Sequence, residues 1–205
     1  MTSLIRTDRH ISDAANNTDS YRLLRGRTSV WKTAPDARLM PYLEQAGFGS
    51  AALIRSSDVR YDLIFALLRL PIDGSLVTGV SSFTDPAALC YELLGDSPGD
   101  GEKNFTGLQF TWLKAKFGQL SATATEGELM CAARAYIMYI VGGVIMSDAN
   151  NDKVHLMYLP LLADLSTVSS YSWGSAVLAM LYQELCRVTN PDVVDMGGCL
   201  PLLQS

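Results

Sequence analysis

The fold is decided by residues 125–145, which read TEGELMCAARAYIMYIVGGVI. Thr125 and Glu128 have the spacing of a capping box, in which a hydroxyl and a carboxylate satisfy backbone N–H groups at the start of a helix. Behind them, apolar side chains recur at helical spacing as far as Ile145. These residues therefore predict a long buried helix, with the other elements packed around it.

Gly142 and Gly143 lie inside that predicted helix. Each glycine lowers helix propensity by about 1 kcal/mol relative to alanine, so we expect another helix to pack closely against them. The most apolar stretch, residues 135–146, is shorter than the roughly 20 apolar residues that cross a bilayer. We therefore predict a core helix of a soluble intracellular protein, with no membrane partner.

Shorter helices are predicted on both sides, each from an N-cap residue, an apolar stripe and a breaker. The first is capped by Asp36, carries Leu39, Leu43 and Ala46 on one face and restarts at Pro41. The next four are a helix capped by Asp58, a helix between Asp85 and Gly95, a helix over residues 108–117 and a helix over residues 156–165 around Pro160. The last runs from Ser172 to Asn190 and buries Val177, Leu178, Leu181, Tyr182 and Leu185. No segment alternates apolar and polar residues as a half-buried strand does. The predicted fold class is all-α: an irregular multi-helix single domain with little or no β-structure.

Residues 1–35 are predicted to form a disordered or loosely ordered N-terminal arm, because they are polar and lack periodicity. The chain has 16 basic and 21 acidic residues, a net charge of −5, which argues against a general nucleic-acid binder. Residues 1–60 nevertheless carry 9 basic and 6 acidic residues. A patch for an anionic partner is therefore the alternative to a solvated arm there. Its basic residues include Arg22, Arg25, Arg27, Lys32 and Arg38.

No motif in the sequence predicts a reactive site. The histidines, His10 and His155, have neither the neighbours of a metal site nor those of a catalytic triad, and His155 is interpreted as a structural residue at a helix start. The glycine-rich pieces lack phosphate-loop spacing. We therefore predict no catalytic, cofactor-binding or metal-binding residue, and no enzyme. The four cysteines, which show no CxxC spacing, are predicted to be buried free thiols: Cys90, Cys131, Cys186 and Cys199.

Four stretches stand in an order typical of one family. They are residues 52–67, the LPIDGSLVTG segment at 70–79, residues 133–143, and residues 154–186 with YSWGSAVLA at 171–179, extended by residues 197–200. Together they resemble the plant mobile domain, the aminotransferase-like domain of the MAINTENANCE OF MERISTEMS-like family, over roughly residues 36–203.

The resemblance implies a non-enzymatic nuclear interaction module, linked to meristem maintenance, transposable-element silencing and genome integrity. It also implies a phosphatase-like nuclear protein as partner. The alternative is a mobile-element-derived nucleic-acid-binding domain. The family's aminotransferase-like name does not carry over as an activity, because no lysine here has the context of a Schiff-base lysine with a phosphate cup, so no cofactor is predicted.

Relative to the family pattern, residues 36–205 resemble a truncated copy. A block that follows the 52–67 stretch is missing after Leu68, and the family pattern continues beyond the last residues of this chain. Both missing parts would have covered apolar surface. We therefore expect exposed apolar patches, and self-association through them, at two groups of residues: Ile64, Phe65 and Leu68, and Leu200, Leu202 and Leu203.

Overall fold

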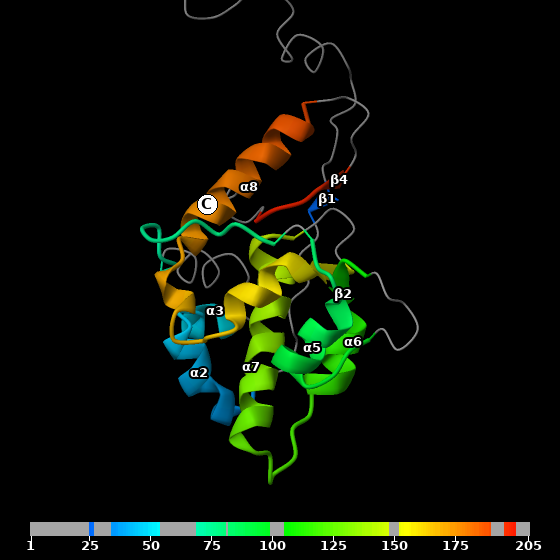
Figure 1. Cartoon of the computed structure of the whole chain (residues 1–205). Coiled ribbons are helices and arrows are strands. Elements are labelled where there is room, and N and C mark those ends of the chain that lie inside the picture. The colour runs from blue at the N-terminus through cyan, green and yellow to red at the C-terminus, as the bar shows by residue number, and fades with distance from the viewer. Residues whose placement is uncertain are drawn as a thin grey trace, which may run out of the picture.

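The computed structural model describes residues 25–26, 34–53, 69–80, 82–98, 105–147, 152–189 and 195–199. Helices make up most of these residues, and their strands form two short two-stranded sheets (Figure 1). The predicted mostly helical fold is confirmed. The predicted helix capped by Asp58 lies outside the described residues, and so does the predicted N-terminal arm apart from residues 25–26 and 34–35.

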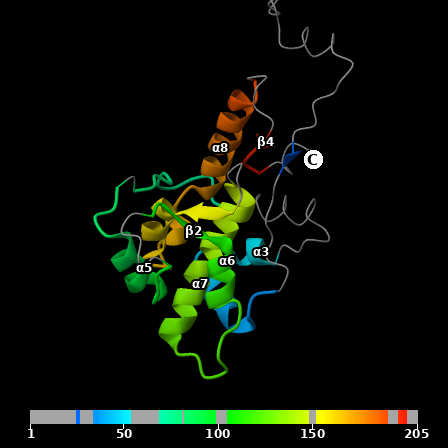
Figure 2. The ribbon, with the colours of Figure 1, turned by 90° about the vertical axis from the view of Figure 1, so that its right-hand side faces the viewer.

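The central element is helix α7, Glu126–Ile140, which runs through the middle of the bundle (Figures 1 and 2). The predicted capping box is present: the Glu128 backbone N–H donates to the Thr125 hydroxyl, and the Thr125 backbone N–H donates to the Glu128 carboxylate at 2.7 Å. Every residue of α7 from Ala135 to Ile140 is buried. The helix continues as the π-helical turn η2, Val141–Ile145, which is also buried.

Shorter elements pack on both sides of α7. The turn η1, Ala37–Leu39, and helices α2, Met40–Gln45, and α3, Gly49–Ala52, lie on one side. Helices α5, Pro86–Leu94, and α6, Phe110–Phe117, lie on the other (Figure 1). The predicted caps at Asp36 and Asp85, the restart at Pro41 and the stop at Gly95 are all confirmed.

The predicted helix at 108–117 begins two residues late. Residues Gly107–Gln109 form strand β2, which pairs antiparallel with β3, Lys153–His155, in a register that joins Leu108 to Val154. Leu108 is fully buried in this strand. A single apolar residue fits the inner face of a short strand as well as it fits a helix stripe, so its spacing could not distinguish the two.

The same small sheet corrects the prediction for the glycine pair. A Cβ atom at Gly142 would overlap the side chain of Val154 on β3. The close neighbour of Gly142 is therefore a strand and not the expected helix. The absence of a side chain lets β3 pass directly over η2.

The last third of the domain is built from short helical pieces. The 3-10 helix η3, Leu156–Leu162, contains Pro160 and stops before the predicted 165. It is followed by the 3-10 turn η4, Val168–Ser170, and by helix α8, Trp173–Arg187. Proline lacks an N–H and cannot continue an α-helical ladder, which accounts for the tighter geometry of η3. Strand β4, Asp195–Met196, then pairs in parallel with β1, Arg25–Gly26.

One described helix is long and apolar enough to cross a membrane by length and composition: the continuous segment Glu126–Ile145, of which 72% of the apolar window is buried inside the domain. That burial agrees with the prediction of a core helix, because its apolar face is already covered by protein.

Candidate functional site

The start of α8 is held by a segment that lies about a hundred residues earlier in the chain. The Gly174 N–H donates to the Pro71 carbonyl at 2.9 Å, and the Ser175 hydroxyl donates to the Ile72 carbonyl at 2.8 Å. The first backbone N–H groups of a helix have no partner within the helix, so acceptors from elsewhere are needed. Residues 71–75 supply them, and we call this contact between 71–75 and 170–175 the α8 joint.

A short parallel bridge between Ser75 and Tyr171 extends the α8 joint. The Ser75 N–H donates to the Ser170 carbonyl at 2.9 Å. The Ser172 backbone N–H and hydroxyl both donate to the Ser75 carbonyl, at 2.8 and 3.1 Å. Ser172 stands at the predicted N-cap position of α8, but its hydroxyl bonds to Ser75 and makes no side-chain cap bond within the helix.

Two glycines make the close approach in the α8 joint possible. Gly74 has a φ of 135°, which side chains rarely adopt, and a Cβ atom there would overlap the Ser170 carbonyl. A Cβ atom at Gly174 would lie 2.9 Å from Cγ2 of Ile72 and 3.2 Å from the Pro71 carbonyl oxygen. A larger residue at Gly74 would displace backbone, whereas one at Gly174 would first have to move the Ile72 side chain.

Trp173 fixes the joint to the core. Its side chain is fully buried, and its indole Nε1–H donates to the Val168 carbonyl at 2.9 Å. Its ring meets Phe48 edge to face, with centroids 5.2 Å apart. A buried indole needs such an acceptor, so Trp173 both fills space and orders the η4 turn.

Arg134 on α7 joins three elements through backbone carbonyls. Its guanidinium donates to Leu162 at 2.8 Å, to Ala163 at 2.9 Å and to Leu93 at 3.2 Å. These carbonyls lie at the ends of η3 and α5, where helices leave carbonyls unpaired. Arg134 lies within the 133–143 stretch that carries the family resemblance, and no pattern in the sequence predicts its contacts with these carbonyls.

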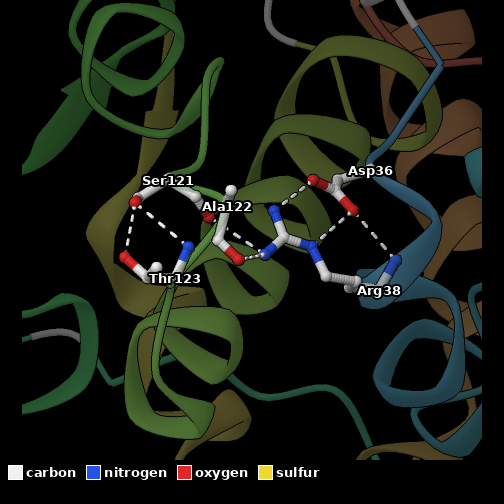
Figure 3. Close-up of polar contacts among 5 residues, drawn as sticks. All are labelled: Asp36, Arg38, Ser121, Ala122 and Thr123. Carbon is white, nitrogen blue, oxygen red and sulfur yellow. Dashed lines mark hydrogen bonds and ion pairs between the residues drawn. The ribbon is translucent and has the colours of Figure 1, made fainter.

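Arg38 makes a similar connection at the start of the domain (Figure 3). It donates to the Asp36 carboxylate, with a shortest distance of 2.7 Å, and to the carbonyls of Ser121 at 2.9 Å and Ala122 at 3.2 Å. The side-chain hydrogen bond from Arg38 lowers the pKa of Asp36 to about 2. Arg38 thus has structural partners, whereas the side chains of the other basic residues named for the anionic patch lie outside the described residues.

A pocket of about 350 Å³ opens beside the β2–β3 sheet. Its lining is mostly apolar, with His155 and Thr106 as polar members: Val80, Phe83, Pro86, Phe105, Thr106, His155 and Met157. His155 ends β3 and occupies the N-cap position of η3, which agrees with its predicted place at a helix start. In the part of the chain that the structure describes, no group of three His, Cys, Asp or Glu residues could hold a metal ion.

The cysteines are free thiols, as predicted, but their burial differs. Cys90 and Cys199 are buried, Cys131 is half-buried and Cys186 is exposed. Burial raises the pKa of the Cys90 thiol to about 12, so it stays protonated at neutral pH. The prediction of burial is wrong for Cys186, because this residue lies on the outer face of α8.

The outer face of α8 also carries apolar residues that were predicted to be buried. Leu178, Tyr182 and Leu185 are 56%, 70% and 39% exposed, whereas Val177 and Leu181 are buried. Successive helix residues are about 100° apart, so Val177 and Leu181 face the domain while the other three face away from it. The two groups named for exposed apolar patches, at 64–68 and 200–203, lie outside the described residues.

Comparison with known proteins identifies a family and several relatives. The profile of the plant mobile domain matches residues 61–205. "Serine/threonine-protein phosphatase 7 long form homolog" from Arabidopsis thaliana is 40% identical over 138 residues, which cover 67% of this chain and 10% of that protein. "Protein MAINTENANCE OF MERISTEMS" from the same plant is 32% identical over 238 residues, covering 100% of this chain and 49% of that protein.

The chain spans half or less of the length of these curated relatives. The alignment with the second relative is longer than the 205 residues of this chain, so it contains gaps opposite segments that this chain lacks. That agrees with a block missing relative to the family. No solved structure matches the chain significantly.

Proposed function

This chain belongs to the plant mobile domain family, and from that membership we propose that it acts as a non-enzymatic interaction module in the nucleus. The proposed processes are those that the family resemblance implies: meristem maintenance, transposable-element silencing and genome integrity. The proposed partner is a phosphatase-like nuclear protein.

The α8 joint is the observation that carries this proposal. In the YSWGSAVLA segment, residues 171–179, three side chains donate hydrogen bonds to backbone carbonyls: Ser172 to Ser75, Trp173 to Val168 and Ser175 to Ile72. Arg134 is engaged in the same way. These family residues therefore hold the helices and turns of the domain together. An interaction module needs such a rigid scaffold to present its binding surface.

The phosphatase-like partner is supported by one relative. A protein named as a phosphatase 7 long form homolog matches 67% of this chain. Because the match covers 10% of that protein, a domain of this kind occurs in one chain with other segments. We infer that this chain meets a phosphatase-like protein in trans.

The test is co-purification of the tagged full chain from plant nuclei. We expect a phosphatase-like protein to be recovered with the wild-type chain and lost with Trp173→Ala, which removes the core residue of the joint. Recovery of no such protein by a folded wild-type chain would contradict the proposed partner. Catalytic turnover of a phosphoserine peptide by the purified chain would contradict the non-enzymatic role.

A further inference from the structure

The pocket beside the β2–β3 sheet is apolar in its deeper part and polar at its rim. Pro86, at the start of α5, is its buried lining residue. Phe83 and Phe105 are half-buried and pack against the core. Thr106 and His155 are exposed. A molecule in the pocket would therefore meet apolar surface inside and hydrogen-bonding side chains where it faces water.

Backbone contacts hold two sides of the pocket in place. On one side, the Thr106 carbonyl accepts a hydrogen bond at 2.8 Å from the backbone N–H that follows His155. Thr106 and His155 therefore lie at the same end of the β2–β3 ladder. On the other side, the Val80 N–H donates to the Met157 carbonyl at 3.3 Å. These bonds lie within the chain, so the pocket forms without the help of a ligand, which lowers the cost of binding.

The size and the charge of the pocket define what fits it. An apolar cavity of about 150 Å³ can hold benzene, so about 350 Å³ has room for two fused rings. Phe83, Phe105 and Met157 offer the ring and sulfur contacts that aromatic ligands form. None of the described lining residues is Asp, Glu, Lys or Arg. A permanently charged ligand would therefore lose water there without gaining a counter-charge.

We propose that this pocket binds an uncharged small molecule with two fused aromatic rings and one hydroxyl group. The rings lie against Phe83, Phe105 and Met157. The ligand hydroxyl bonds to the Thr106 hydroxyl at the rim, next to His155, because a threonine hydroxyl can both donate and accept. This binding goes beyond the proposed nuclear interaction role and does not depend on it.

The first test asks whether the rim recognises a hydroxyl group. The probe is 2-naphthol, and naphthalene is the matched ligand without the hydroxyl. In equilibrium dialysis of the full chain at neutral pH, we expect saturable binding of one 2-naphthol per chain. Thr106→Val, which keeps the shape of the side chain, should weaken 2-naphthol about fivefold and leave naphthalene unweakened. Equal weakening of both ligands would overturn the assigned hydroxyl contact.

The second test locates the bound rings. Val80→Trp adds a bulky side chain to the pocket lining, whereas Leu76→Trp adds the same side chain to an exposed position of the same segment outside the lining. We expect Val80→Trp to weaken both ligands by roughly tenfold or more, and Leu76→Trp to bind them as the wild type does. Circular dichroism and melting temperature verify that all variants fold.

Three results would overturn the proposal. The first is no saturable binding of 2-naphthol by the folded wild type up to about 1 mM. The second is equal weakening by Val80→Trp and Leu76→Trp, which would place the probe elsewhere on the domain. The third is tighter binding of N-acetyltryptophanamide than of 2-naphthol, because the pocket would then hold a side chain of a protein and not a small molecule.

Discussion

Arg134 is the residue whose loss should affect the fold most directly. Arg134→Ala removes hydrogen bonds to Leu162, Ala163 and Leu93, and bonds from charged donors contribute about 1.5–3 kcal/mol each, though not additively. We expect a loss of about 2–4 kcal/mol in urea unfolding. Arg187→Ala, which breaks an exposed pair, should lose at most about 1 kcal/mol. Equal effects of the two substitutions would show that the carbonyl contacts are not stabilising.

Gly174 and Gly127 should respond to alanine with opposite signs. A Cβ atom at Gly174 approaches Ile72 and two backbone carbonyls, whereas one at Gly127 meets nothing within 4 Å. Gly174→Ala should destabilise by about 1–3 kcal/mol through overpacking. Gly127→Ala should stabilise by up to about 1 kcal/mol through helix propensity. Thermal unfolding of both variants checks the signs.

Asp36 should make stability depend on acid pH. Its pKa falls from 3.8 to about 2 in the folded chain, so its contribution is complete above pH 3.8 and is lost as the pH falls towards about 2. Asp36→Asn keeps an oxygen acceptor for the helix cap but loses the charge. We expect it to be less stable than wild type at neutral pH by at most about 1 kcal/mol, because the pair is exposed. Urea unfolding at neutral pH and near pH 2 should show that difference closing in acid.

At the scale of elements, caps and breakers could be predicted from sequence because they act locally. The capping box at Thr125 and the stop at Gly95 depend on residues within one turn. The strand at Leu108 and the neighbour of Gly142 depend on Val154, which only the tertiary structure brings close. The α8 joint could not be predicted for the same reason, since its two halves lie far apart in sequence.

Helix α8 shows the limit of periodicity. Its apolar residues cover more than one face, and the sequence alone does not reveal which face the domain covers. Val177 and Leu181 face inward, while Tyr182 faces outward. The spacing correctly predicted that residues 173–187 form a helix. It wrongly predicted that Leu178, Tyr182 and Leu185 belong to the buried face.

At the scale of the whole molecule, the cysteines should report global unfolding. Cys186 is exposed, whereas Cys90 and Cys199 are buried. We expect a thiol reagent at neutral pH to modify Cys186 in the folded chain and to reach Cys90 and Cys199 only when the core opens. Peptide mapping by mass spectrometry identifies each site. Rapid modification of Cys90 without denaturant would contradict a closed core.

The α8 joint has a consequence for biosynthesis. Ser175 bonds to a residue 103 positions earlier, and ribosomes add roughly 5–20 residues per second. Residues 71–75 therefore leave the ribosome several seconds before their partners exist. During that interval their carbonyls can bond only to water or to transient neighbours, so the joint closes late, and a chaperone could shield this segment until its partners emerge.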